Sequence, residues 1–310
     1  MLRGCHTGNV PGLSHRPDAM AECLPVHELG GVLKMLYTHL PDSMAVYSPV
    51  ELVSRGLSGY VVYVDRFPNI SAVLVMPDDA GFHSSDHEKS VFLFSLPHSD
   101  IQSLLDMSGL LKQENITFCV VWEDVYEKVK GVITSWQASP FTELASSGSA
   151  VYYTDNVPEI PDLPGGYTTR SLVPTDYEMI ITGVEYKKAN YVKSVKRILA
   201  MGTLSVGVED EGSKTLVAWS LQQLYGYLGM TFVQPEHRNK GLGKYVTTRL
   251  ARMMIDKNGF CMAAIGGQNT PSISMHLKLG FTRMNRLFYS GLFRATGFTT
   301  GSNVAIMSCS

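Results

Sequence analysis

Short apolar runs bounded by turn residues recur along the first half of the chain. Four of them are typical of buried strands and lie at 59–64, 71–76, 91–94 and 117–122. Between the strands the apolar residues have the spacing of an amphipathic helix, as at 101–107. Strands that alternate with helices predict an α/β domain.

A segment rich in proline and glycine then interrupts the pattern. Asn156 to Gly166 contains three prolines and two glycines, and proline removes a backbone donor and fixes φ, so neither a helix nor a central strand runs through it. We therefore expect a linker at 156–166. It separates a domain at 25–155 from a second domain at 167–296, with a disordered leader at 1–24 and a tail at 297–310.

The second half has the clearer pattern. Residues 167–172 alternate as a strand, and the capping box Thr175 to Glu178 predicts a helix running toward Met201. Further strands are expected at 204–208, 215–222, 226–233 and 260–265, and a last strand from 281. A helix over about 241–257 places Leu242, Val246, Leu250 and Met253 on one face. Thr270-Pro271 predicts another helix start, and Gly280 its end. The prediction is two tandem α/β domains, the second a mixed sheet flanked by helices.

Composition narrows the class of protein. At about 150 residues a domain, 310 residues fit two domains. The net charge of −2 disfavours a nucleic-acid binder that coats phosphates. The five cysteines are scattered, which disfavours a disulfide frame or a zinc site. We expect no metal, since His83 and His87 stand in a polar loop typical of solvated side chains. The uncharged stretch 215–235 contains glycines and glutamines, so we expect two strands there rather than a membrane span.

One loop has the residues for binding a phosphate. Arg238 to Gly243 reads R-x-x-G-x-G between a predicted strand and a predicted helix. A helix N-terminus offers unpaired N–H groups and about half a positive charge, and glycines let an anion approach the backbone. Lys240 and Lys244 add positive charge. The loop matches neither the P-loop nor the dinucleotide fingerprint, and six residues alone are a weak signal.

A second motif stands at a fixed distance downstream and makes the pattern specific. It is Asn269-Thr-Pro-Ser-Ile-Ser-Met-His-Leu-Lys-Leu-Gly-Phe281. In this order and spacing, about residues 165–292 resemble the GNAT-type acyltransferase superfamily. Further segments narrow the resemblance to the glycine N-acyltransferase-like family, which joins an N-terminal acyltransferase-like domain to a C-terminal GNAT-type domain. These segments are Leu40 to Tyr47, Val64-Asp65, Phe67-Pro68, Val75 to Pro77, Val217 to Ser220 and Pro235 to Arg238.

The resemblance implies transfer of an acyl group from acyl-coenzyme A to the amino group of glycine or a similar small amino acid. Two alternatives stay open: a GNAT enzyme acting on another amine, and a binding protein that keeps the acyl-coenzyme A pocket without catalysis. The expected partners are small molecules, with no nucleic acid and no membrane, and the protein is expected to be a monomer. The family resemblance favours a mitochondrial location, whereas the leader lacks an Arg-rich amphipathic helix and leaves a cytoplasmic location open.

The resemblance also assigns a cofactor site by position. The pyrophosphate of coenzyme A would lie on the backbone of 239–243, the pantetheine along the strand ending at Val233, and the thioester carbonyl at an N–H near Phe232 or Val233. The residues expected to contact coenzyme A are Phe232, Val233, Arg238, Asn239, Lys240, Gly241, Leu242, Gly243, Lys244 and Asn269.

Two residues are candidates for proton transfer. His276 stands where many GNAT proteins carry a tyrosine, and its ordinary pKa of about 6.5 suits a proton donor to the leaving thiolate; the alternative is a packing residue. Tyr227 stands where the family resemblance leads us to expect a basic glutamate, and a phenol with a pKa of about 10 is a poor base. Ordered water, Glu209, Glu236, His237 or a different amine are the alternatives, and Tyr227 would then be a core residue.

Overall fold

The computed structural model describes residues 21–83, 89–136, 141–182 and 189–295. The first half runs β1 (Glu22–Leu24), α1 (Leu29–Tyr37), α2 (Met44–Ser54), β2 (Tyr60–Val64), β3 (Ala72–Pro77), α3 (Asp79–His83), β4 (Ser90–Ser95), α4 (Ile101–Met107), β5 (Asn115–Trp122), α5 (Glu123–Thr134) and β6 (Phe141–Thr154). The second half runs β7 (Tyr167–Arg170), α6 (Tyr177–Thr182), α7 (Ala189–Ala200), β8 (Ser205–Asp210), β9 (Leu216–Gln222), β10 (Leu228–Val233), α8 (Leu242–Asn258), β11 (Cys261–Ile265), α9 (Thr270–Lys278) and β12 (Thr282–Ala295).

The two halves repeat the same order of elements. Leaving aside α3 and the short 3-10 turns, each half runs strand, two helices, three strands, helix, strand, helix, strand. The helix between the fourth and fifth strands is α4 in the first half and α8 in the second. In each half the fourth and fifth strands are parallel neighbours, β4 with β5 and β10 with β11, whereas every other described pair is antiparallel. The chain is therefore a tandem repeat of one α/β unit, as expected for the fold class.

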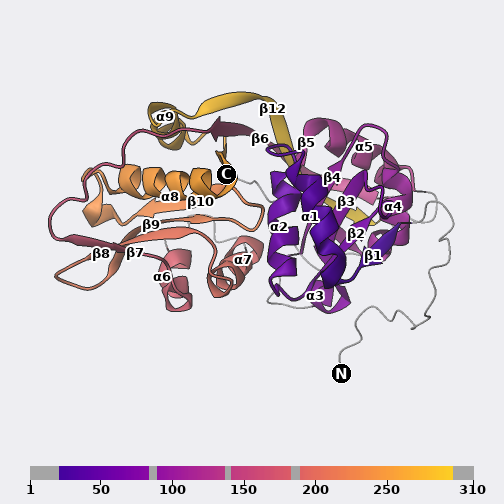
Figure 1. Cartoon of the computed structure of the whole chain (residues 1–310), viewed down its shortest axis with the longest axis horizontal. Coiled ribbons are helices and arrows are strands. Elements are labelled where there is room, and N and C mark those ends of the chain that lie inside the picture. Colours follow the sequence, from indigo (N-terminus) through magenta and orange to yellow (C-terminus); the bar gives the residue numbers. More distant parts are fainter. Residues whose placement is uncertain (1–20, 84–88, 137–140, 183–188, 296–310) are drawn as a thin grey trace.

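The last strands of the two repeats change places. The strand order is β1-β2-β3-β4-β5-β12-β6-β11-β10-β9-β8-β7, so β12 joins the first repeat beside β5 and β6 joins the second beside β11. Figure 1 shows both strands running between the halves. One sheet of 12 strands results, and its hydrogen bonds cross the expected division of the chain at 156–166.

Most of the expected elements of the second repeat are present, with two differences. The helix expected from Thr175 toward Met201 is described in two parts, α6 from Tyr177 to Thr182 and α7 from Ala189 to Ala200, and residues 183–188 lie outside the described residues. In addition, residues 22–24, which lie within the expected leader, pair with β2 as β1.

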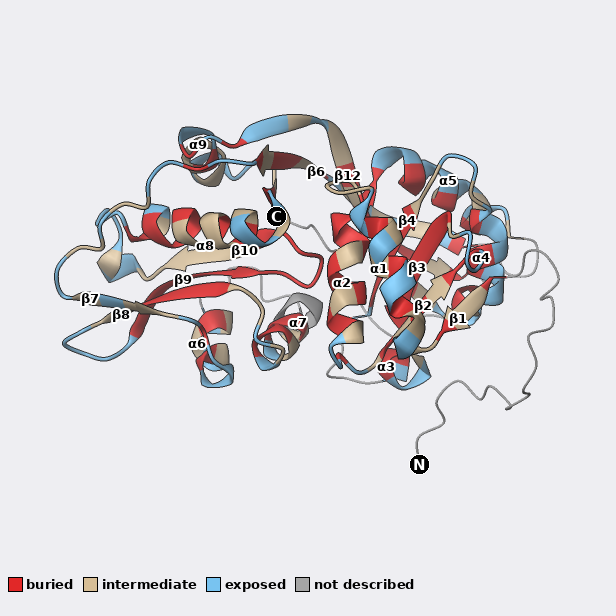
Figure 2. Cartoon of the chain, viewed as in Figure 1, coloured by how far each residue is buried: buried red, intermediate tan, exposed pale blue. Residues whose placement is uncertain are grey.

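One buried cluster contains residues from both repeats. Val46 and Val50 of α2 belong to the same buried cluster as Trp219 and Tyr227 of the second repeat. Figure 2 shows the continuous burial of β3 and β9 and the buried side of α2. On α8 the buried face is completed by Met254 rather than by the expected Met253. The two repeats thus share one buried core, and α2 lies against the turn between β9 and β10 at Gly226.

Candidate active site

The parallel strands β10 and β11 separate soon after they meet. Their register contains a single pair, Leu228 with Ala263. On its other edge β10 pairs with β9, but between Gly229 and Phe232 it uses one residue more than β9 does. This bulge turns the strand, with Met230 at a φ of 53°. The strands therefore open a gap in the middle of the sheet.

A cavity of about 720 Å³ occupies this gap. One end is basic and lies at the start of α8, where His237, Arg238 and Lys244 line it. The other end, near the turn between β9 and β10, is uncharged and includes Gln223, Tyr225 and Met230. Trp219 and Phe232 lie between the two ends, since the Phe232 ring centroid is 5.8 Å from Arg238 Cζ and 4.9 Å from the Trp219 ring. No Asp or Glu lines the cavity within the described part of the chain. The cavity thus combines a basic end with an uncharged end.

The backbone of Val233 faces this cavity. The N–H of Gln234 donates to the carbonyl of Val217 at 2.8 Å, and Val233 stands opposite Ala218. Because bonded and non-bonded pairs alternate along antiparallel strands, Val233 directs its N–H and C=O away from β9, toward the gap. Its carbonyl accepts a hydrogen bond from Arg238 Nε at 3.2 Å. The N–H is therefore placed to donate to a bound carbonyl.

The start of α8 has the features of an anion site. Gly241, at the N-cap, has a φ of 84° and provides no side chain to satisfy the first N–H groups of the helix. A β-carbon on Gly241 would meet nothing within 4 Å, and one on Gly243 would lie 3.5 Å from Val233 Cγ2. The free N–H groups and the open approach leave room for a phosphate beside β10.

The cations near this helix start differ in their contacts. Arg238 and Lys244 line the cavity, whereas Lys240 does not. Lys240 Nζ instead donates to the Tyr167 hydroxyl at 3.0 Å and lies over the Tyr167 ring. In this structure Lys240 therefore contacts β7 rather than the cavity, and its contact with a phosphate stays a prediction. The other residues expected at the coenzyme line the cavity: Phe232, Val233, Asn239, Gly241, Leu242, Gly243 and Asn269.

Asn269 has a structural role in addition to its place in the wall. Its side chain caps α9 by accepting from the Ser272 N–H at 3.2 Å. Such a cap stabilises a helix by about 1 kcal/mol. Asn269 thereby orients the helix that carries His276.

His276 is a buried, neutral imidazole at the cavity wall. Its Nδ1 lies 2.8 Å from the Ser272 carbonyl, and because a carbonyl only accepts, Nδ1 carries the hydrogen. Nε2 is then left with its lone pair, buried and without a partner in the described chain. Burial lowers the pKa of His276, more than its bond to Ser272 raises it. In this state His276 accepts a proton, and it becomes the expected donor only after taking one.

Tyr227 is not part of the cavity wall. It is 1% exposed and packs edge-on against Phe288 with ring centroids 5.8 Å apart. Burial is the first cause that raises the pKa of its phenol. A hydroxyl that is harder to ionise and does not line the cavity is no base for a substrate there, so Tyr227 is a core residue, which was the alternative interpretation.

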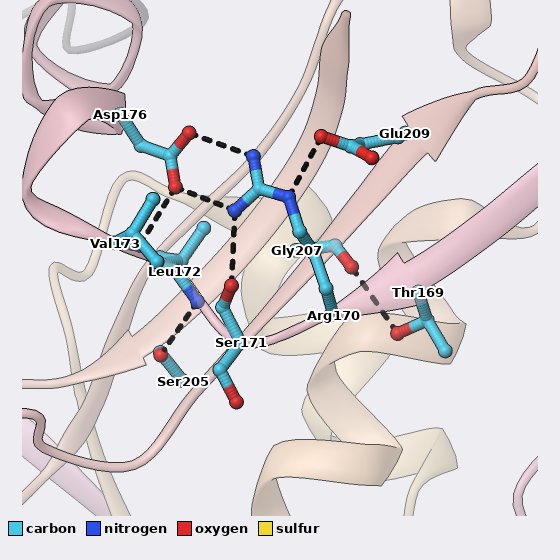
Figure 3. A network of polar contacts seen from close by, with 9 residues as sticks. All are labelled: Thr169, Arg170, Ser171, Leu172, Val173, Asp176, Ser205, Gly207 and Glu209. Atoms are coloured by element: carbon cyan, nitrogen blue, oxygen red, sulfur yellow. Dashed lines mark hydrogen bonds and ion pairs between the residues drawn. The ribbon is translucent and has the colours of Figure 1, made fainter. Parts of the chain in front are cut away.

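The alternative bases are also engaged or remote. Figure 3 shows Glu209 bound to Arg170, at 2.7 Å, while Arg170 also holds both carboxylate oxygens of Asp176 at 2.6 and 2.7 Å. Neither Glu209 nor Glu236 lines the cavity. His237 does, but at the basic end, with Nδ1 2.9 Å from the Tyr167 hydroxyl. His276, by contrast, lines the cavity and keeps its Nε2 without a partner among the described residues.

Sequence reasoning missed the uncharged end of the cavity and the aromatic residues beside it. Trp219 was part of the resemblance only as a motif, and Gln223, Tyr225 and Met230 were treated as strand and turn residues. Their place in one wall depends on the bulge in β10 and on the turn at 223–226, closed by the bond from the Gly226 N–H to the Gln223 carbonyl at 2.8 Å. The glycines Gly226 and Gly229 were the only signal of an unusual backbone.

Other sites and spans are not found in the described chain. No three His, Cys, Asp or Glu side chains among the residues placed by the structure are grouped to hold a metal ion; the pair His83 and His87 reaches beyond them. In the same residues, no helix has the length and apolar character needed to cross a membrane.

Comparison with known proteins finds a family match within the second half and gives the fold of the whole. Residues 205–289 match the family model described as FR47-like protein. A solved Drosophila protein matches 90% of this chain and 99% of its own, with a TM-score of 0.67 and 17% identity. The tandem GNAT protein from the clavulanic acid biosynthesis pathway matches 91% of this chain and 100% of its own, with a TM-score of 0.55 and 14% identity.

A third structure has the same extent of similarity. A putative acetyltransferase from Pyrococcus horikoshii matches 92% of both chains, with a TM-score of 0.53 and 10% identity. No curated protein matches the chain. At such identities the structures establish the fold and leave the substrate open. The chain therefore has the tandem GNAT fold, and its second half contains an FR47-like region.

Proposed function

We propose that the protein is an acyl-coenzyme A-dependent N-acyltransferase that acylates glycine or a similar small amine. The observation that carries the proposal is the cavity between β10 and β11, with an uncapped helix start at one end and a neutral histidine in its wall. The FR47-like match over 205–289 covers the same strands and helices.

The basic end suits the diphosphate of coenzyme A. The N–H groups at the start of α8 point along the helix axis to a site that Gly241 leaves open, and Lys244 adds a positive charge at its edge. A ligand held there extends along β10 past Val233. Arg238, bound to the Val233 carbonyl, fixes the loop between strand and helix.

The reaction joins the amine nitrogen to the thioester carbon and breaks the carbon–sulfur bond. The Val233 N–H donates to the carbonyl oxygen as negative charge develops, and one such donor is worth about 3 kcal/mol. Nε2 of His276 accepts the proton that the amine loses. The same imidazolium then returns that proton to the leaving thiolate, so that no net charge remains on the protein.

A non-catalytic acyl-coenzyme A-binding protein is the second candidate. It is favoured by one observation, the lack of any Asp or Glu among the described residues that line the cavity. A GNAT enzyme for another amine, such as a protein N-terminus, is compatible with the same walls.

The test is release of free coenzyme A, measured with a thiol reagent for a series of acyl donors and amine acceptors. Glycine, glutamine, an arylalkylamine and a short peptide with a free N-terminus cover the alternatives. We expect release that depends on both donor and a small amine. Tight donor binding without release for any acceptor would contradict the proposed catalysis and leave the binding function.

A further inference from the structure

We propose that Gln223 binds the acceptor amine, through its side-chain amide, at the uncharged end of the cavity. The inference rests on the proposed function and adds a residue that determines acceptor use. Gln223 follows β9 directly and lines the cavity although only 6% of it is exposed.

The side chain of Gln223 lies against the bulge of β10. A β-carbon at residue 229 would lie 2.0 Å from Gln223 Nε2 and 2.8 Å from its Cδ, so Gly229 is required for this position of the amide. Gly229 is also where the extra residue of β10 begins. The amide is therefore fixed at the point where the strand turns away from β9.

The turn that holds Gln223 is supported from the other repeat. Its N–H donates to the Tyr227 carbonyl at 2.8 Å, and its own carbonyl accepts from the Gly226 N–H at 2.8 Å. A β-carbon on Gly226 would lie 2.6 Å from Met44 Cε of α2. With the backbone held on both sides, the amide has little freedom to turn away.

The amide forms no side-chain hydrogen bond with another residue in the part of the chain that the structure describes. Gln223 is 6% exposed and lines the cavity, so its amide can form a hydrogen bond with what the cavity holds. Its Nε2 faces Gly229, which leaves Oε1 as the acceptor for a ligand. Tyr225 and Met230, which also line this end of the cavity, have uncharged side chains.

The chemistry of this end fits a primary amine. An amine N–H donates to Oε1 of Gln223, which directs the nitrogen lone pair to another side. An uncharged oxygen stabilises ammonium over amine less than a carboxylate does, so the proton is lost more readily. The basic residues Arg238 and Lys244 follow the end of β10, whereas Gln223 lies against Gly229 near its start. The acceptor is thus proposed to bind near the start of β10 and the diphosphate beyond its end.

The experiment compares Gln223→Met with Gln222→Leu in the full chain. Gln222 is the preceding residue, is also buried and does not line the cavity. Release of coenzyme A gives KM and kcat for the acceptor, and calorimetry gives the Kd of coenzyme A. We expect Gln223→Met to raise the acceptor KM about tenfold, the cost of one hydrogen bond, without changing the Kd of coenzyme A. Gln222→Leu should leave the acceptor KM unchanged.

A second variant keeps the inference testable if Gln223→Met fails to fold. Gln223→Glu has the same shape and places a carboxylate beside the amine, so the acceptor KM should fall and the apparent pKa in the kcat/KM profile should rise. An unchanged KM and pH profile in both variants, with normal turnover, would overturn the role of Gln223 alone. No turnover by the unaltered protein with any amine would overturn the proposed function as well.

Discussion

Gly226, in the turn between β9 and β10, packs against Met44 of α2, so that the two repeats meet at the uncharged end of the cavity. A β-carbon at Gly226 would lie 2.6 Å from Met44 Cε and 2.8 Å from Ser48 Cβ, and the φ of Gly226 is 83°. The turn tolerates no side chain at this position. The first repeat therefore supports the wall that contains Gln223 and Tyr225.

Gly226→Ala should destabilise the protein by about 3 kcal/mol. The left-handed backbone costs an L-residue about 1–2 kcal/mol, and crowding against Met44 adds about 1–3 kcal/mol. Gly202 is the matched control, since its φ is 61° and a β-carbon there meets nothing within 4 Å. In urea unfolding, the free energy of unfolding lost by Gly202→Ala should be about half of that lost by Gly226→Ala, or less. Equal losses would show that Met44 does not restrict the turn.

His276 should make stability depend on pH. Its folded pKa is lowered by burial, whereas in the unfolded chain it is about 6.5. Below that value the unfolded state binds the proton more readily, so stability falls as the pH drops from 7 toward 5. His276→Gln removes this titration. The difference in unfolding free energy between the two proteins should therefore change over this range and be constant above pH 7.5. A difference that is constant throughout would contradict the buried neutral state.

Asp176→Asn should weaken the anchoring of α6. Burial raises the pKa of Asp176, but the Arg170 guanidinium and the Val173 N–H outweigh it, and the net pKa lies below the usual value. The ionised carboxylate therefore stabilises the fold at neutral pH, and this contribution is lost as the pH falls below about 4. We expect a loss of about 2 kcal/mol at pH 7, because Arg170 keeps Glu209 as a partner.

The matched control for this ion pair is the exposed carboxylate of Asp162. Asp162→Asn should change the unfolding free energy by less than about 0.5 kcal/mol. Urea unfolding at pH 7 and pH 3 separates the two variants. If Asp176→Asn loses as much stability at pH 3 as at pH 7, its effect does not come from the ionised pair.

Coenzyme A should bind once per chain. The counterpart of α8 in the first repeat is α4, whose N-cap Asp100 accepts hydrogen bonds from the Ser103 N–H at 2.9 Å and its hydroxyl at 2.6 Å. A carboxylate at this helix start competes with and repels a phosphate. Calorimetric titration with coenzyme A should give one site, and a value near two would contradict this difference between the repeats.

Local signals in the sequence predicted much of the second repeat. The helix expected over about 241–257 is confirmed as α8, which ends at Asn258 before Gly259 with a φ of 84°. The apolar runs of β9 and β11 were recognisable because nearly all of their residues are buried. Glycines at 241 and 243 indicated the helix start, because a residue without a side chain leaves the first N–H groups of the helix accessible to a ligand.

The pairing of strands that lie far apart in the sequence could not be predicted from single segments. The exchange of β6 and β12 depends on hydrogen bonds between strands more than 100 residues apart, and nothing local specifies the partner. The partner of Lys240, Tyr167, is likewise on a distant strand. The bulge between Gly229 and Phe232 changes which side chains of β10 face the cavity. Tyr227 comes just before this strand, and no local pattern indicated that it lies in the core.

The most direct test of the account is the affinity of coenzyme A for the intact chain, compared with Gly241→Ala and Gly241→Glu by calorimetry. Both variants strain the same left-handed backbone, but a β-carbon at Gly241 enters open space and only glutamate brings a negative charge. The account predicts that Gly241→Glu binds at least about 100-fold more weakly than Gly241→Ala, a difference of ~3 kcal/mol. Equal affinities in two folded variants would place the diphosphate away from α8 and contradict the account.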